Sequence, residues 1–396
     1  MIYLSYFFIS FVISLFVTVR RQALSVVLFL TFIFIGLSFP AGGDWIGYFQ
    51  NYDCSINNIC NSDFTMFEYG YELIVNIFGY LGFQSIIIFI AIINIFAIRS
   101  FSIKFDKPAI VVVFFMCMFL WSLYIEAIRQ SLAISLLLFG IFYLYKYEIK
   151  KFIFIIILAS LFHITALICL VFVIPYFSLR ISKFVSFLLL TFAMLFVVTP
   201  IPILEFLIQL LPENSIAGMK LSFYLFSDKY SPQVSIGLGT ILDFVLLGIL
   251  LLTFWRNYKS DLKNDIRFHN VVFLGVALYL SFGVFAGKMM PVITRVGWYG
   301  LPFVIIFIYS NLGKSIYYKK VDSSGKPLLT NIVIFIYFML QILRPLTYEY
   351  NNYGIMNQKL IIQKIYNLDD ASLRIEANNK CYALTNLGYG YLCGKN

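Results

Sequence analysis

Residues 124–167 read YIEAIRQSLAISLLLFGIFYLYKYEIKKFIFIIILASLFHITAL, two apolar segments that flank the basic turn KYEIKK. The pattern predicts two helices that run antiparallel on either side of this turn. Three ionisable side chains, Glu126, Arg129 and His163, lie within or beside the apolar sequence. A charge at membrane depth costs roughly 2.5 kcal/mol or more, so such a group usually has a partner or a function. Because Arg129 and His163 then lie on one side of the bilayer, we expect the chemistry there.

The composition of the whole chain defines its class. Of 396 residues, 61% are hydrophobic and 12% are charged, and the mean hydropathy is +0.89. Soluble domains are about 25% charged, so the sequence predicts an all-α, polytopic integral membrane protein with about 11–12 transmembrane helices. The net charge of +10 does not indicate a nucleic-acid partner. The basic residues lie in short loops between apolar runs, which is the pattern of cytoplasmic loops in membrane proteins.

The positions of the charges predict the orientation of the helices. Arg20 and Arg21 join the first two spans and place that turn in the cytoplasm. The first span lacks the features of a signal peptide, so we expect it to be retained. Residues 40–70 contain no Lys or Arg and form an expected periplasmic loop, as do residues 201–235. We expect one transmembrane domain over residues 1–346 and a polar periplasmic tail over 347–396.

The stretch 152–178 has two interpretations that give opposite orientations to the chain after it. It is either one long tilted span or a short hairpin with His163 near its outer apex. The hairpin places ten Lys and Arg residues in short cytoplasmic loops, against four for the single span. Since short loops carry the orientation signal, the count favours the hairpin and about twelve crossings with both chain ends outside.

Four cations near the predicted outer surface are candidate ligands for an anion. Arg129 begins an inward-running helix, where backbone N–H groups and the helix dipole favour negative charge and the guanidinium adds a fork of donors. Arg295 begins another span, with Lys288 seven residues earlier, and Arg344 ends the last span. The alternative for Arg129 is an ion pair with Glu126 that only anchors the helix. The alternative for Arg295 is interfacial anchoring, helped by an aromatic pair that follows it.

Candidate acids and bases lie on the same side of the predicted bilayer. Asp44 follows two glycines at the end of the second span, Glu68 and Glu72 flank the sequence YGY, and His163 has a pKa range near neutrality. The alternatives are a loop aspartate after a helix stop and a neutral histidine in helix packing. The sequence contains no nucleotide-binding glycine loop, no nucleophile elbow and no Cys/His cluster. We therefore expect no cofactor and no metal site.

The six cysteines fall into two groups. Cys117 and Cys169 lie in apolar spans and are expected core residues. The other four lie in predicted periplasmic segments. Four cysteines allow three pairings, and the simplest joins the two cysteines within each segment. Because the periplasm is oxidising, we predict local disulfides, Cys54–Cys60 and Cys381–Cys393.

Several short motifs, in this order, resemble the EpsG-type branch of the O-antigen polymerases (Wzy). Gly43-Asp44-Trp45 with Tyr48 and Tyr52 is similar to G-x-D-Y-x-x-Y, and FEYGY at residues 67–71 is similar to E-P-G-Y, with Tyr in place of Pro. IRQSLA at residues 128–133 is similar to I-R-Q-x-x-A, and FHITAL at residues 162–167 to F-H-x-S-A, with Thr in place of Ser. Arg295 with Tyr299 is similar to R-x-x-x-Y. The likeness covers about residues 45–300 and leaves out the tail.

This resemblance implies a bacterial inner-membrane glycosyltransferase with its active site facing the periplasm. It would transfer a growing glycan from undecaprenyl diphosphate to another undecaprenyl-diphosphate-linked repeat unit. Besides this oligosaccharide lipid, the expected partners are membrane lipids and a chain-length regulator protein. A flippase or transporter of lipid-linked oligosaccharide and an O-antigen ligase remain alternatives. The expected roles are catalytic for Asp44, His163 and Glu68, diphosphate-binding for Arg129, Arg295, Lys288 and Arg344, and supporting for Glu126, Gln130, Glu72, Tyr48 and Tyr299.

Overall fold

The fold was taken from a computed structural model, which describes most but not all of the chain. The described residues are 2–39, 41–60, 67–210, 266–287, 291–313, 328–363, 368–388 and 390–393, with isolated positions between 212 and 249 and at 315–317.

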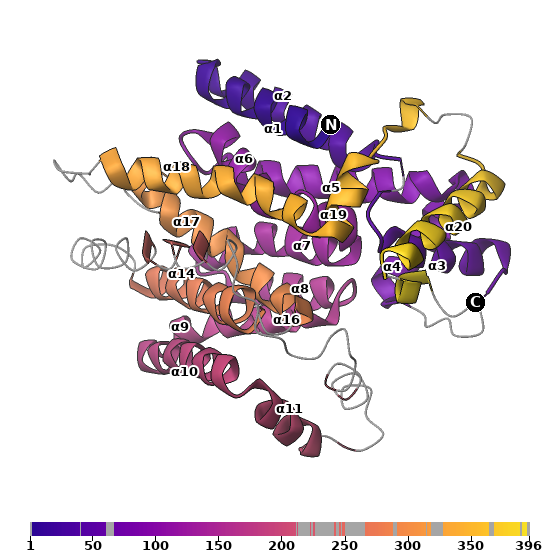
Figure 1. The fold of residues 1–396 in the computed structure, drawn as a ribbon. Coiled ribbons are helices and arrows are strands. Elements are labelled where there is room, and N and C mark those ends of the chain that lie inside the picture. The colour runs from indigo at the N-terminus through magenta and orange to yellow at the C-terminus, as the bar shows by residue number, and fades with distance from the viewer. Residues whose placement is uncertain are drawn as a thin grey trace. The chain divides into compact units, whose positions relative to one another are not determined.

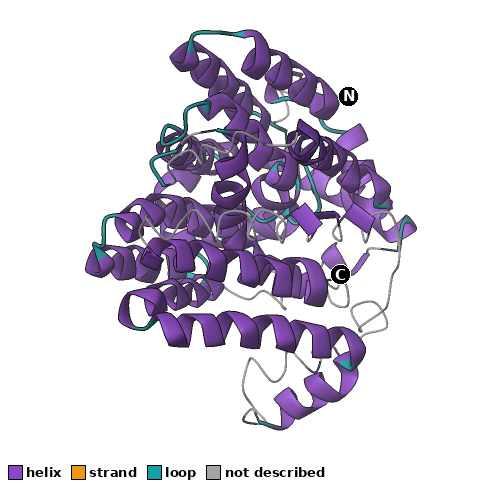
Figure 2. Cartoon of the chain, turned by 90° about the vertical axis from the view of Figure 1, so that its left-hand side faces the viewer, coloured by secondary structure: helices purple, strands orange, loops and turns teal. Residues whose placement is uncertain are grey.

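Most of the described residues are helical and none belongs to a strand, apart from a single β-bridge between Ser38 and Leu360, which confirms the predicted all-α class (Figure 2). The α-helices are α1 (Ile2–Phe16), α2 (Arg20–Gly36), α3 (Trp45–Asn57), α4 (Tyr69–Phe78), α5 (Phe83–Ser102), α6 (Pro108–Phe119), α7 (Ile128–Tyr145), α8 (Ile149–Ser160), α9 (Ile174–Phe177), α10 (Leu179–Val198), α11 (Pro200–Gln209), α14 (Ile266–Leu278), α16 (Pro291–Gly297), α17 (Leu301–Leu312), α18 (Leu328–Leu343), α19 (Glu349–Met356) and α20 (Asp370–Asn386). Short 3₁₀ or π segments are η1 (Gly79–Leu81), η2 (Ser122–Glu126), η3 (Ile164–Val173), η5 (Tyr279–Ala286), η6 (Trp298–Gly300), η7 (Arg344–Thr347), η8 (Ile361–Gln363) and η10 (Gly390–Cys393).

Five stretches in the described part are long and apolar enough to cross a membrane. Three shorter apolar helical segments accompany them, and α18 with η7 meets α19 at a bend of 94°. The polytopic membrane class is therefore confirmed, whereas the number of crossings stays a prediction. The five spans are Phe83–Ser102, Ile128–Tyr145, Leu179–Val198, Ile266–Ala286 and Ile293–Ser310.

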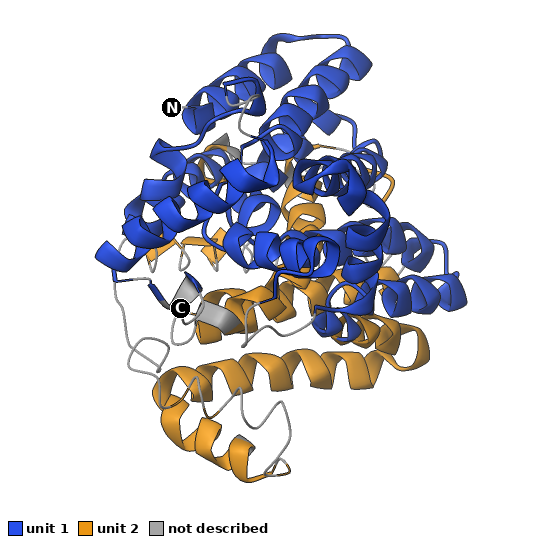
Figure 3. Ribbon diagram, turned by 90° about the vertical axis from the view of Figure 1, so that its right-hand side faces the viewer, with its two compact units in different colours: residues 1–167, 335–396 blue, residues 168–334 orange. Residues whose placement is uncertain are grey.

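The chain packs as two compact units (Figure 3). Unit 1 contains residues 1–167 and 335–396, and unit 2 contains residues 168–334. The C-terminal tail belongs to unit 1, so the two ends of the sequence build one packing unit.

Apolar faces and a few internal polar contacts hold the spans of unit 1 together. Helices α5 and α7 pack on each other, and α7 packs on α8. Asn94 of α5 donates to Ser131 of α7 at 3.0 Å and accepts from Ser135 at 2.7 Å. All three side chains are buried, and a buried polar group that meets its partner avoids a cost of about 1–3 kcal/mol. These contacts fix the rotation of α7 and so the direction in which its first residues face.

The apolar stretch around residues 124–178 is broken at two places. The first break is η2, where Glu126 N–H bonds to Trp121 across five residues and Ala127 leaves the helical region with φ −108° and ψ 57°. The second separates α8 from η3 at residues 161–163. This second break is the feature that the hairpin interpretation of residues 152–178 requires and that a single tilted span does not. The orientation of the hairpin in the membrane stays a prediction. Both breaks fall at candidate site residues, Glu126 in the first and His163 in the second.

Polar helices of unit 1 gather beside the breaks. Helices α3, α4 and α20 lie together at one side of Figure 1, with α20 from the tail over α3 from the first predicted loop. Both predicted disulfides, Cys54–Cys60 and Cys381–Cys393, are confirmed, with Cα atoms 4.4 and 5.6 Å apart. Cys117 and Cys169 are free and buried, also as predicted.

Unit 2 is built mainly from α10, α14, η5, α16 and α17. Glycines allow α14 and α17 to pack closely, because a Cβ at Gly275 would overlap the ring of Phe303. Gly300 likewise lies against the carbonyl oxygen of Gly275. Of the predicted loop 201–235, the structure describes the part of α11 that falls within it and a few single positions, so the rest of that prediction lies outside the described residues.

Candidate functional site

Four segments with the resemblance motifs meet in unit 1. They are the turn before α3, the start of α4, the start of α7 and the end of α8. Backbone contact joins α4 to α8, since Gly70 N–H donates to the carbonyl oxygen of Leu161 at 2.8 Å. A Cβ at Gly70 would lie 2.8 Å from that same oxygen, so only glycine permits the approach. The motif FEYGY is thereby held against the break that carries His163.

Arg129 is the centre of this convergence. Its guanidinium forms an ion pair with Glu68 and lies 3.8 Å from the ring centroid of Phe67 and 5.8 Å from that of Tyr48. The side chains of Arg129 and Glu68 are 22% and 25% exposed, so the pair is accessible from outside the unit. The Nε atom of Arg129 is buried and has no hydrogen-bond acceptor in the described structure. The guanidinium is therefore fixed in place while part of its donor fork is unused.

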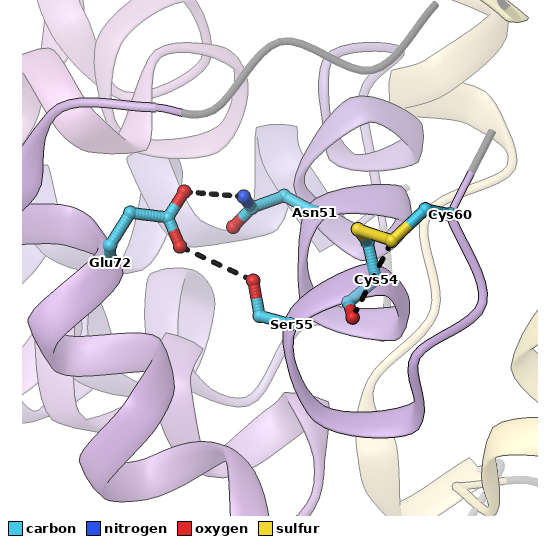
Figure 4. Close-up of a disulfide and its surroundings, with 5 residues drawn as sticks. All are labelled: Asn51, Cys54, Ser55, Cys60 and Glu72. Atoms are coloured by element: carbon cyan, nitrogen blue, oxygen red, sulfur yellow. Dashed lines mark hydrogen bonds between the residues drawn. A yellow bond between two sulfur atoms is a disulfide. The ribbon is translucent and has the colours of Figure 1, made fainter. Parts of the chain in front are cut away.

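Glu72 organises the platform under Arg129 rather than a reactive site. It accepts hydrogen bonds from Asn51 at 2.6 Å and Ser55 at 3.3 Å, both on α3 (Figure 4). It also accepts from the backbone N–H of Phe67 at 3.0 Å. The carboxylate therefore ties α3 to α4 and holds the backbone of Phe67, on whose ring Arg129 stacks, while the supporting role expected for Glu72 stays a prediction.

Glu126 does not pair with Arg129, which was the alternative to a functional arginine. Its Oε2 accepts the N–H groups of Gly43 and Asp44 at 2.9 and 3.0 Å and the hydroxyl of Tyr350 at 3.1 Å. Its Oε1 is buried with no partner among the described residues. Burial raises the pKa of Glu126, and the nearby Asp44 charge adds to this, while the two N–H groups and Lys380 oppose it. Glu126 therefore fixes the turn that presents Asp44.

The glycines of this turn have no room for a side chain. Gly42 has φ +78°, and a Cβ there would lie 2.6 Å from Glu126 Oε1. A Cβ at Gly43 would overlap the hydroxyl of Tyr350. The motif Gly43-Asp44 is thus required by the close approach of a carboxylate from η2 and a tyrosine from α19.

His163 lies at the break after α8, half-buried, with Thr165 Oγ1 2.6 Å from its Nδ1. Thr165 occupies the position where the motif has serine, and its hydroxyl makes a contact that a serine also could make. Gln130, the next residue after Arg129, is fully buried. The structure thus brings Asp44, Glu68, Arg129 and His163 into one unit, with direct contact between Glu68 and Arg129.

The C-terminal tail is tied onto α3 by an ion pair. Arg374 of α20 donates from Nε and Nη2 to the two carboxylate oxygens of Asp53, at 2.8 and 2.6 Å. Burial raises the pKa of Asp53, but the bonds from Arg374 and Asn57 outweigh it, so that the pKa is lowered overall. Nearby, Asp370 accepts from the hydroxyl of Tyr52 at 3.0 Å. The tail is therefore a fixed part of unit 1.

Sequence reasoning missed two tail residues that reach this region, Tyr350 and Lys380. The Lys380 ammonium lies 5.6 Å from the ring centroid of Trp45, the first residue of α3. A signal was present, because Leu373, Ala377 and Leu384 recur at helical spacing and are all buried. Lys380 falls on this buried stripe, where a surface lysine is not expected.

The other predicted cations are not among the described residues that contact Arg129. Arg295 lies in the last turn of α16 in unit 2 and is half-buried, and Tyr299 in η6 is fully buried. Lys288 lies outside the described residues. Arg344, half-buried in unit 1, begins η7 at the bend between α18 and α19. No group of three potential metal ligands occurs within the described ranges. The assignment of these three cations to one site stays a prediction.

The fold and site thus define a polytopic helical membrane protein with a charged, aromatic site at the ends of its spans. The profile of the EpsG family matches residues 22–355, most of the chain, and the protein belongs to the EpsG family. At family level this is a membrane glycosyltransferase-like polymerase. Searches of curated proteins and of solved structures find no match to the chain.

Proposed function

We propose that the protein is a bacterial polysaccharide polymerase of the O-antigen type. It transfers a growing glycan from undecaprenyl diphosphate to the sugar end of a second undecaprenyl-diphosphate-linked repeat unit. The observation that carries the proposal is Arg129, a guanidinium fixed by Glu68 and Phe67 with an unused donor at the meeting point of the family motifs. A fixed fork of N–H donors matches phosphate oxygens, and preorganised donors stabilise charge that develops during reaction.

The bond changes follow from the substrates. The acceptor hydroxyl oxygen forms a bond to the anomeric carbon of the donor while the bond from that carbon to the diphosphate oxygen breaks. The electron pair of the broken bond stays on the diphosphate, where Arg129 stabilises the added charge. The acceptor proton passes to a base, for which Asp44, His163 and Glu68 are the candidates. By analogy with glycoside chemistry, the anomeric carbon becomes oxocarbenium-like, and a carboxylate beside it lowers the barrier.

The proposed location is the bacterial inner membrane, with the site facing the periplasm. The two disulfides support it, because disulfides persist in oxidising compartments. Cysteine substitutions at Ser55 and Ser372 should react with a membrane-impermeant label on intact spheroplasts. A substitution at Ser260, outside the described residues, should react only after permeabilisation. External labelling at Ser260 would reverse the helix orientation after His163.

The direct test supplies purified lipid-linked repeat unit to the protein in vesicles. Formation of a ladder of longer lipid-linked chains supports the polymerase. Movement of the substrate across the bilayer without elongation would indicate a flippase instead. Transfer only when a second acceptor is added would indicate a ligase. The matched control is Arg129→Ala protein at the same level, which should give no ladder.

A further inference from the structure

Lys380 is a cation with no bonded partner beside the candidate site. Among the described residues, it makes no hydrogen bond and no ion pair, and its ammonium lies 5.6 Å from the ring centroid of Trp45. It is half-buried and lies on the stripe that packs α20 on unit 1. An ammonium carries three donors, and partial burial without protein acceptors leaves fewer water molecules to bond them, which is unfavourable. A ligand with acceptor oxygens would remove this cost.

A second donor in the same place also lacks an acceptor. Trp45 is 3% exposed, and its indole Nε1 is buried without a hydrogen-bond partner in the described structure. The tryptophan N–H can only donate a hydrogen bond, so an acceptor such as a phosphate oxygen would satisfy it. Two unsatisfied donors, one of them charged, therefore lie at the start of α3.

The first turn of α3 connects these donors to Arg129. Trp45 and Tyr48 are three residues apart and lie on the same face of the helix. Lys380 lies over the ring of Trp45, and Arg129 lies near the ring of Tyr48. The two cations thus lie near side chains that are one helical turn apart on the same face of α3.

We propose that Lys380 and the indole N–H of Trp45 form a second anion position that binds one phosphate of the lipid-linked diphosphate, next to the position of Arg129. The inference rests on the proposed function and adds the tail to its substrate site. The ties Arg374–Asp53 and Asp370–Tyr52 hold α20 over α3 and so keep Lys380 in place. The tail of this chain, most of which lies beyond the family match at residue 355, then contributes to substrate binding.

The rival explanation is that Lys380 only balances the buried charge of Glu126. Electrostatic attraction between the two is present, although they form no ion pair in the described structure. The explanations differ in a double substitution. If Lys380 is a counter-ion, removing both charges restores function. If it is a ligand, the double variant is no better than the single one.

The first experiment measures protection of the wild-type protein. An amine-reactive reagent is applied to the full chain in detergent, with and without inorganic pyrophosphate, and the modified lysines are located by mass spectrometry. Pyrophosphate should slow modification of Lys380 and leave Lys359, an exposed lysine of the same tail, unchanged. Equal rates at Lys380 with and without pyrophosphate would overturn the anion position. This result is independent of whether the protein polymerises glycans.

The second experiment measures substrate affinity in vesicles. Lys380→Met should raise KM for the lipid-linked repeat unit about 10–100-fold, the effect of one charged hydrogen bond, while Lys359→Met should not. Lys380→Arg should retain most of the affinity, and it serves as the test if the methionine variant does not fold. A lipid monophosphate should compete less well than pyrophosphate.

The outcomes separate the inference from the function that it extends. Absence of any ladder with wild-type protein would reject the polymerase, whereas pyrophosphate protection of Lys380 would still establish the anion position. Unchanged KM in Lys380→Met would reject the inference while the ladder keeps the polymerase. Recovery of KM in the Glu126→Gln, Lys380→Met double variant would identify Lys380 as a counter-ion and also reject it.

Discussion

Replacing Arg129 by lysine tests whether the guanidinium acts as a fork or as a point charge. Lysine keeps the positive charge but has no planar group to stack on Phe67, whose ring centroid lies 3.8 Å from the guanidinium carbon. It also offers a single donor position where arginine offers two at fixed geometry. If the fork binds the diphosphate, lysine should therefore lose much of the activity despite the conserved charge.

The structure sets the size of the effect. Loss of one charge-assisted hydrogen bond costs about 1.5–3 kcal/mol. Loss of stacking at a site that is 22% exposed adds about 0.5–1 kcal/mol. Together they correspond to roughly a 30–1000-fold loss. This agrees with the ~10²–10³-fold effect of removing one preorganised donor at an active site.

The assay is the polymer ladder from purified lipid-linked repeat unit, with variants at matched membrane levels. Arg20→Lys, at an exposed arginine at the start of α2, is the control and should give the wild-type ladder. A wild-type ladder from Arg129→Ala would end the diphosphate assignment. A normal ladder from lysine but not from alanine would retain the charge and reject the fork.

Four further predictions concern the tail. Arg374→Met should weaken its attachment by about 1–2 kcal/mol, a value kept small because Arg374 is 38% exposed, and limited proteolysis should cut α20 faster. The pKa of Asp53 in the folded protein is lowered from 3.8, so the Arg374–Asp53 ion pair stabilises the fold above pH 3.8. This stabilisation is lost as the pH falls through the lower folded pKa. A rate of proteolysis that does not change with acidification would contradict this prediction. Burial lowers the pKa of Lys380 to about 8, although the charges of Glu126 and Glu376 oppose the shift. KM should therefore rise as the pH increases through about 8, because Lys380 loses its charge. Lys380→Arg should move this rise to higher pH. Mass spectrometry of non-reduced peptides should recover Cys381 linked to Cys393, and free thiols there would contradict the structure.

Local patterns in the sequence were sufficient for the fold class and for several candidate residues. Hydropathy and loop charge are properties of contiguous residues, so the spans and the break near His163 could be inferred without knowing what packs where. The disulfides were predictable for the same reason, since Cys54 and Cys60 are only six positions apart. The motif residues were found by their types and order along the chain.

The partners of those residues were not predictable, because they come from distant parts of the chain. Glu126 was weighed as the ion-pair partner of Arg129, three residues away, whereas the structure pairs Arg129 with Glu68, 61 residues away. Spacing along a helix favoured the first pair, but the break after η2 and the close contact of α4 with α8 favour the second.

By itself, the sequence determined that this is a helical membrane protein with arginine, carboxylate and histidine side chains at the ends of its spans. Only the tertiary structure decided which of them act together. It placed the tail over α3 through the ion pair of Arg374 with Asp53, 321 residues apart, and gave Tyr350 to Glu126 across 224 residues. Contacts over such separations depend on how the helices pack, and packing follows from the shapes of many side chains at once rather than from any local pattern.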